Sequence, residues 1–86
     1  MYVIVVYDIE VERLNDVRKF LKRFLHHVQR SVFEGKITKS QLFYILRKLK
    51  RMINPEKDSI IIYVISQRSA ITQRISLGSN KFSFIK

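Results

Sequence analysis

Asp8 is the acidic residue in the most apolar setting of this 86-residue chain, and it is the first candidate for chemistry. It follows the run Tyr-Val-Ile-Val-Val-Tyr, so it stands where a strand would end and a side chain would emerge at the rim of a sheet. Carboxylates in clefts are often functional. The nearby acids are Glu10 and Glu12 in the following loop, and a lone aspartate at a strand end is more often a turn former. Residue type and spacing alone therefore favour a structural role for Asp8.

The other residue types that carry chemistry form no recognisable catalytic arrangement. Without cysteine the chain has neither disulfides nor thiolate metal sites, and two glycines cannot build a phosphate-binding loop. Ser31 has no neighbouring base that would activate it. His26 and His27 are adjacent, so in a strand they point to opposite faces. Tyr7 and Phe33 lie in apolar segments and are expected to be core aromatics, although Phe33 has the ring needed to stack on a base.

Positive charge is the strongest functional signal in the composition. The chain has 17 Lys and Arg against 7 Asp and Glu, a formal net charge of +10. Residues 17–53 hold eleven of these cations and one acid, Glu34. Such asymmetry favours a polyanionic partner, nucleic acid ahead of an acidic membrane surface, whereas a merely solubilising surface usually mixes both signs. Arg13, Arg18 and Arg30 are candidates for phosphate contacts, with a solvated surface as the alternative.

The first half of the chain predicts a strand, a helix and further strand structure. Residues 2–9 are a nearly continuous β-branched apolar run, typical of a strand buried on both faces at the centre of a sheet. In residues 12–25 the apolar positions recur every three or four residues, which predicts an amphipathic helix with a basic outer side. Residues 27–33 alternate as one bent strand or two very short ones would, and residues 34–36 predict a turn.

The second half predicts another helix and more strands. Thr38 and Gln41 match a capping box at the start of a second amphipathic helix, which Asn54 and Pro55 end. Residues 59–65 are a second continuous β-branched run and predict a second central strand. The remaining residues are interpreted as an edge strand at 74–77, a turn at 78–80 and a strand at 81–86.

This order of elements predicts an α+β fold, a ferredoxin-like βαββαβ sandwich with an antiparallel sheet that carries both helices on one face. We expect residues 1–77 to form this domain and 78–86 a C-terminal tail whose strand pairs with, or is exchanged with, a dimer partner. So small a domain buries its uncovered sheet face most economically against a second copy. No segment is long and apolar enough to span a membrane, and the N-terminus does not resemble a secretion signal, so we expect a cytoplasmic protein without a membrane partner.

Several motifs together resemble those of the CRISPR-associated protein 2 family. They are the strand end Tyr7-Asp8-Ile9, Arg13, a first helix ending in Phe-Leu, Val-Gln-Arg-Ser-Val-Phe-Glu-Gly at 28–35 and Asp-Ser-Ile-Ile-Ile-Tyr at 58–63. The resemblance covers nearly the whole chain. It departs at residues 25–27, where Leu-His-His fills a joint that holds glycine in many members of the family.

The resemblance implies a homodimer that acts in the acquisition of CRISPR spacers, with CRISPR-associated protein 1, the integrase, as its partner. Several members are described as magnesium-dependent endoribonucleases or DNases. The resemblance then makes Asp8 the metal ligand, with one Mg²⁺ shared between the two Asp8 side chains of a dimer, and places Tyr7, Arg13 and Phe33 beside it as catalytic residues. Together with the charge pattern, it predicts nucleic-acid contacts at Arg13, Arg18, Lys22, Arg30, Arg47 and Arg51.

Two functions stay open on this basis. The first is a Mg²⁺-dependent phosphodiesterase, an endoribonuclease acting on single-stranded RNA or else a DNase. The second is a non-catalytic scaffold that holds duplex DNA between integrase subunits. Both require a basic surface that binds phosphates without reading base sequence.

Overall fold

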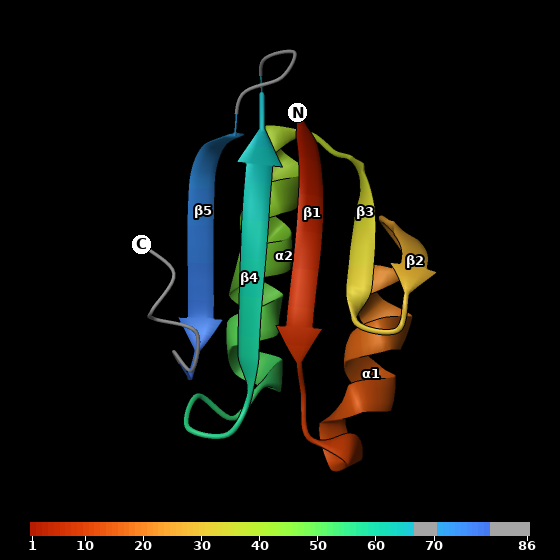
Figure 1. Ribbon diagram of the computed structural model, residues 1–86, viewed down its shortest axis with the longest axis vertical. Helices are drawn as coiled ribbons and strands as arrows, with labels where there is room; N and C mark the ends of the chain where they lie inside the picture. The colour runs from red at the N-terminus through yellow and green to blue at the C-terminus, as the bar shows by residue number, and fades with distance from the viewer. Residues whose placement is uncertain (67–70, 80–86) are drawn as a thin grey trace.

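The computed structural model describes residues 1–66 and 71–79, which form one sheet backed by two helices (Figure 1). In chain order the elements are β1 (Tyr2–Asp8), α1 (Val11–Leu21), β2 (His26–Gln29), β3 (Val32–Lys36), α2 (Lys39–Met52), β4 (Ser59–Ile65) and β5 (Ile71–Gly78). The strand order across the sheet is β2-β3-β1-β4-β5, and every neighbouring pair is antiparallel. Both helices lie behind the sheet in Figure 1. The predicted ferredoxin-like α+β arrangement is therefore confirmed.

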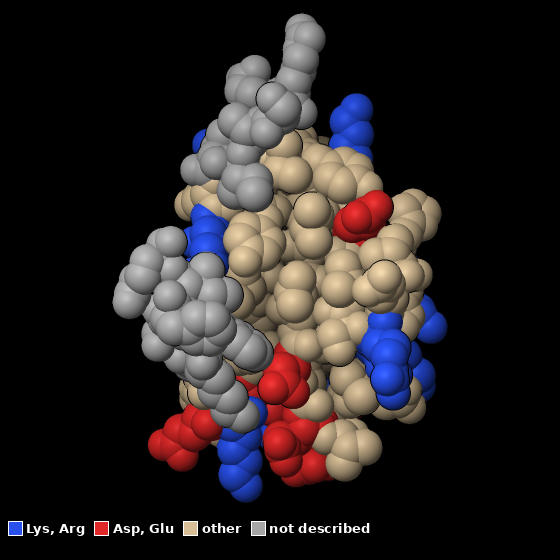
Figure 2. Space-filling view, viewed as in Figure 1, with Lys and Arg blue, Asp and Glu red and all other residues tan. Residues whose placement is uncertain are grey.

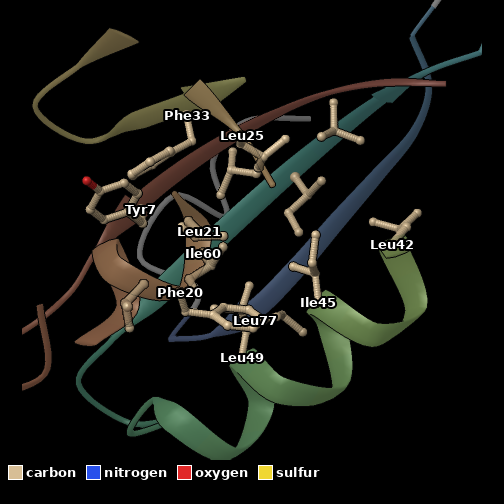
Figure 3. Close-up of a cluster of buried hydrophobic side chains, with 14 of the residues drawn as sticks. Tyr7, Phe20, Leu21, Leu25, Phe33, Leu42, Ile45, Leu49, Ile60 and Leu77 are labelled. Carbon is tan, nitrogen blue, oxygen red and sulfur yellow. The ribbon is translucent and has the colours of Figure 1, made fainter. Parts of the chain in front are cut away.

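The core lies between the sheet and the two helices. β1 is central, flanked by β3 and β4, and its alternate residues Val3, Val5 and Tyr7 point into the core. From β4, Ile60 and Ile62 lie opposite them in register. The helices contribute a buried set that Figure 3 shows packed against the sheet: Phe20, Leu21, Leu42, Ile45 and Leu49. Burial of this apolar layer is the main driving force for the fold.

Local signals set the ends of α2. The Thr38 hydroxyl accepts a hydrogen bond from the backbone N–H of Gln41 at 3.1 Å, and the Gln41 side chain accepts one from the Thr38 N–H at 2.9 Å. This is the predicted capping box. At the other end the helix stops at Met52, before Asn54 and Pro55. Asn54 then turns the chain, because its side-chain oxygen accepts hydrogen bonds from the next two backbone N–H groups, those of Glu56 and Lys57.

The prediction for residues 34–36 was wrong. They lie in β3, and the turn falls earlier, at residues 30–31, so the segment forms two short strands. Gly35 occurs within a strand because it pairs with Val3 where Leu25 packs closely, and an added Cβ would come within 3.0 Å of the Leu25 Cδ2 atom. Gly35, which the sequence suggests as a turn residue, thus allows close packing between a strand and Leu25 instead.

β5 is the extra strand expected after the βαββαβ unit, and it lies at the edge of the chain's own sheet, paired with β4. It is longer than predicted, and the proposed domain boundary at residue 77 falls inside it. Gly78 ends β5 with a φ of +79°, a conformation that side chains rarely adopt. The predicted strand at 81–86 lies outside the described residues, and exchange between two chains stays a prediction.

Candidate active site

Asp8 is exposed at the carboxyl end of β1, on the sheet face that the helices leave open. Its backbone lies opposite Ser59, the first residue of β4. A pocket of about 320 Å³ opens beside it, lined by Val6, Tyr7, Asp8, Ser31, Ser59, Ile61 and Tyr63. The site therefore combines one accessible carboxylate with hydroxyl groups and apolar walls.

The donor set at Asp8 suits Mg²⁺ in kind, though one chain supplies few ligands. Carboxylate and hydroxyl oxygens are hard ligands, which Mg²⁺ prefers to nitrogen or sulfur, and this ion often takes one or two carboxylates and keeps its waters. Among residues 1–66 and 71–79, no three His, Asp or Glu side chains gather closely enough to hold a metal ion. In the described part of one chain, Asp8 is thus an exposed carboxylate outside any cluster of three such ligands.

The turn that carries Ser31 to the pocket is held by hydrogen bonds to one carbonyl, that of Arg30. The Tyr7 hydroxyl donates to it at 2.8 Å, and Arg18 Nη2 donates at 3.1 Å. Arg18 Nε also donates to the Tyr7 oxygen at 3.2 Å, so the two side chains support each other. His27 Nε2 lies 3.2 Å from the same carbonyl. Tyr7 and Arg18 thus position the β2–β3 turn from behind.

Two of the residues predicted to be catalytic have buried rings. Tyr7 and Phe33 point into the core, away from Asp8, with ring centroids 5.9 Å apart. Phe33 also stacks on the His27 ring, at 4.5 Å between centroids and 10° between planes. The structure brings these two rings together beneath the β2–β3 turn; Tyr7 contributes to the lining of the pocket, and Phe33 does not. Their catalytic roles stay predictions.

Arg13 contacts Asp58, a residue that sequence reasoning did not single out. The Asp58 carboxylate is fully buried and accepts hydrogen bonds from Arg13 Nε at 2.6 Å and Nη2 at 3.0 Å. It also accepts from the backbone N–H groups of Glu10 at 2.9 Å and Asn54 at 2.8 Å. Asp58 therefore ties the segment after β1 to the segment before β4. These are the two segments that bring Asp8 and Ser59 side by side.

Electrostatics favours the charged form of Asp58 despite its burial. Removal from water by itself raises the pKa of this carboxyl, but the hydrogen bonds from Arg13 and from the two backbone N–H groups outweigh it and lower the pKa to about 2. The hydrogen bond to Asp58 in turn raises the pKa of Arg13. The guanidinium of Arg13 is thus occupied within the fold, and its role in catalysis or in nucleic-acid binding stays a prediction.

The predicted nucleic-acid contacts fall into two groups in space. Arg18 and Arg30 belong to the network around the β2–β3 turn, where the Arg30 side chain is exposed. Lys22, Arg47 and Arg51 are exposed on the helical layer, on the opposite side of the sheet from Asp8. The cations therefore do not converge on the pocket.

The open sheet face is apolar at its centre. We use this name for the side of the sheet away from the helices, whose uncharged centre is visible in Figure 2 with acidic side chains gathered at its lower end. Alternation along β1 and β4 places Ile4, Val6, Ile61 and Tyr63 there. Val6 retains 36% of its exposure although it lies on the central strand. The predicted burial of β1 on both faces therefore does not occur within one chain.

Asp58 could have been suspected from the sequence by one signal. It stands between the helix-stopping Asn54-Pro55 pair and a continuously apolar strand, a position where an acid is either exposed in the loop or buried with a partner. The sequence does not reveal that Arg13 is the partner of Asp58, because the two residues are 45 positions apart and only the order of the strands in the sheet brings them together.

The strand order and the two helices on one face define a ferredoxin-like α+β protein with an exposed carboxylate at the end of its central strand. Residues 1–72 match the family model described as CRISPR associated protein Cas2. The chain therefore belongs to the Cas2 family, which confirms the resemblance found in its motifs. Among the described residues, no helix combines the length and the apolar character that crossing a bilayer requires.

Similar proteins and structures agree with this assignment. The CRISPR-associated endoribonuclease Cas2 of Nanoarchaeum equitans is 51% identical over 94% of this chain and 88% of its own length. The protein of the same name from Methanothermobacter thermautotrophicus is 44% identical over 94% and 88%. A crystal structure of Streptococcus pyogenes Cas2 superposes with a TM-score of 0.70 at 33% identity, covering 77% of this chain and 87% of that one.

Proposed function

We propose that this protein is a homodimeric, Mg²⁺-dependent endoribonuclease that cuts single-stranded RNA at a site built from the two Asp8 side chains of the dimer. The observation that carries the proposal is the position of Asp8, exposed at one end of an open apolar sheet face. The names of its relatives support the reaction class.

A dimer through the open sheet face supplies what one chain lacks. Packing Val6 and its apolar neighbours against a second copy removes exposed hydrophobic surface, at about 25 cal/mol per Å². A two-fold axis near the end of β1 then brings two carboxylates together. Two such groups without a cation between them repel each other, which a shared Mg²⁺ relieves. The two Asp8 carboxylates would hold the ion, which would supply polarisation of a phosphoryl oxygen and a water of lowered pKa.

Residues of the chain then position the substrate around that pair. Exposed Ser31 presents a hydroxyl beside Asp8 that is suited to a phosphate oxygen, whereas Ser59 lines the same pocket but is buried. Tyr7 and Arg18 keep Ser31 in place through the Arg30 carbonyl. Arg30 supplies a cation at the edge of the same turn.

The test of the nuclease is Asp8→Asn, which keeps the size of the side chain and removes its charge. We expect Mg²⁺-dependent cleavage of a labelled single-stranded RNA to fall by at least about 100-fold, while RNA binding measured by anisotropy stays within about twofold. Asp16→Asn, which changes an exposed acid on α1, is the matched control and should cleave normally. Equal cleavage by Asp8→Asn and the unmodified protein, or cleavage that survives EDTA, would refute the catalytic role.

The test of the dimer compares two exposed valines, Val6 on the open sheet face and Val11 at the start of α1. Val6→Arg places a charge on the open sheet face and should convert the dimer to a monomer in sedimentation velocity. Val11→Arg changes a valine that is 81% exposed at the start of α1, and should leave the dimer intact. A Val6→Arg protein that stays dimeric would place the interface elsewhere.

The second candidate is a non-catalytic scaffold that holds duplex DNA beside an integrase in CRISPR spacer acquisition. The observation in its favour is the separation of the exposed helical cations from the Asp8 pocket, which suits holding a nucleic acid better than cutting it. Under this alternative the purified dimer cuts neither RNA nor DNA at any Mg²⁺ concentration, and Asp8→Asn supports integration by the partner as well as the unmodified protein does.

A further inference from the structure

The outer face of α2 combines four exposed cations with one exposed aromatic ring. We define this face by Lys39, Phe43, Arg47, Lys50 and Arg51, all of them exposed. Residues three or four positions apart are neighbours on a helix, so Lys39 and Arg47 flank the ring on either side along the axis. Phe43 retains 55% of its exposure.

The other aromatic rings of the helical layer already contact one another or a cationic side chain. Phe20, Phe24 and Tyr44 pack together at centroid distances of 5.5 to 6.1 Å. Arg23 lies 5.3 Å from the centroid of Phe24, and Lys48 lies 5.9 Å from that of Tyr44. Phe43, by contrast, has neither an aromatic nor a cationic partner among residues 1–66 and 71–79.

The cations on this face are also without acidic partners. In the described part of the chain, the two ion pairs both involve Arg13. The single acid between residues 17 and 53 is Glu34, which accepts a hydrogen bond from Tyr2 on the other side of the sheet. The outer face of α2 is therefore purely positive around an available ring.

We propose that the outer face of α2 binds single-stranded nucleic acid, with one base stacked on Phe43 and the flanking phosphates on Lys39, Arg47 and Lys50. This inference rests on the proposed nucleic-acid-binding function and adds a second contact site to it. Base–aromatic stacking requires an unpaired base, because the bases of a duplex are already stacked on each other. Lys39 and Lys50 are about 16 Å apart along the helix axis, a length that a few nucleotides span.

The position of this face separates it from the Asp8 pocket. α2 lies behind the sheet and Asp8 points to the open face in front, so a strand bound on α2 stays outside the proposed dimer interface. The face would therefore hold a flanking segment of the substrate. A defect there should raise KM for single-stranded RNA and leave kcat unchanged.

The test compares a 12-nucleotide oligouridine with a 12-base-pair RNA duplex by fluorescence anisotropy. We expect Phe43→Ala to weaken oligouridine binding roughly 5- to 100-fold and to change duplex binding by less than about twofold. Phe43→Leu should behave like Phe43→Ala, because it restores apolar surface without a ring. Val11→Ala removes another exposed apolar side chain and should change neither affinity.

A second variant reports on stacking directly. The chain contains no tryptophan, so Phe43→Trp introduces a single indole at the proposed contact, which can be excited selectively at about 295 nm, where tyrosine absorbs almost nothing. Its emission should be quenched by oligouridine and not by the duplex or by polyglutamate, the probe for an acidic protein partner. Quenching by polyglutamate alone would assign the face to an acidic protein and overturn the proposal.

The outcomes distinguish this proposal from the one on which it rests. If the unmodified protein binds neither RNA, the proposed function and this inference both fail. If it binds oligouridine but Phe43→Ala binds equally well, or if Phe43→Leu restores full affinity, the stacking site alone is refuted.

Discussion

Replacing Asp58 by asparagine should destabilise this protein more than any exposed charge substitution. Asn keeps the shape of the side chain but has one acceptor oxygen, and its NH₂ group would face N–H donors that now bind the second carboxylate oxygen. The lowered pKa, from 3.8 to about 2, corresponds to about 2 kcal/mol of stabilisation of the charged form at neutral pH. Removing one partner of a buried ion pair costs about 3–5 kcal/mol, because the other charge is left without compensation. We therefore expect a loss of about 2–5 kcal/mol.

The assay is urea unfolding followed by circular dichroism at a fixed protomer concentration, because dimerisation makes apparent stability depend on concentration. Asp16→Asn, on the exposed side of α1, is the control and should change the free energy of unfolding by less than about 0.5 kcal/mol. In a cycle with Arg13→Met, the double variant should lose less than the sum of the two single losses, because the Asp58 and Arg13 side chains bond each other.

The pH dependence gives an independent check. The folded pKa of Asp58 lies below the unfolded value, so its contribution is present above about pH 4 and is lost as the pH falls towards 2. The stability difference between the unmodified protein and Asp58→Asn should therefore shrink across that window. Two results would refute the conclusion that the charged Asp58 carboxylate stabilises the fold. One is a loss of unfolding free energy below about 1 kcal/mol in Asp58→Asn at pH 7, and the other is a stability difference between the two proteins that stays constant from pH 5 to pH 2.

Three further predictions concern other parts of the fold and are tested by the same unfolding assay. Gly78→Ala should lower the free energy of unfolding by at least about 2 kcal/mol, because the positive φ is strained for alanine and the added Cβ would collide with the Asp58 carbonyl oxygen. In Gly35→Ala the added Cβ meets the movable end of the Leu25 side chain, so the loss of stability should be smaller. Equal losses in the two variants would contradict this ranking. Thr38→Ala removes the cap of α2 and should lose about 1 kcal/mol, with Ser40→Ala as a control that should lose less. Tyr7→Phe removes the hydroxyl that bonds the Arg30 carbonyl and should lose about 1 kcal/mol and reduce cleavage through the displaced β2–β3 turn. Unchanged stability and activity would show that the Tyr7 hydroxyl is not needed to hold the turn.

Much of the framework follows from patterns that are local in the chain. The continuous β-branched runs became β1 and β4, the three- and four-residue periodicity became the helices, and the Thr38–Gln41 pair became a complete capping box. Each of these signals operates within one element, where backbone geometry and side-chain spacing act together. The charge imbalance and the motifs around Asp8 were equally readable, and they led to the correct family.

The features that decide how the site is built depend on contacts between distant segments. Asp58 meets Glu10 and Arg13 across 48 and 45 residues, because the sheet order puts β1 beside β4. The burial of Phe33 was predicted from its apolar segment, whereas the exposure of Phe43 on the outer face of α2 became visible only in the packed structure. Gly35 was misread because its neighbour Leu25 is ten residues away in sequence and adjacent in space. Composition predicts a polyanionic partner and periodicity predicts the helices and strands, whereas only the packing of distant segments decides which charged and aromatic side chains stay exposed.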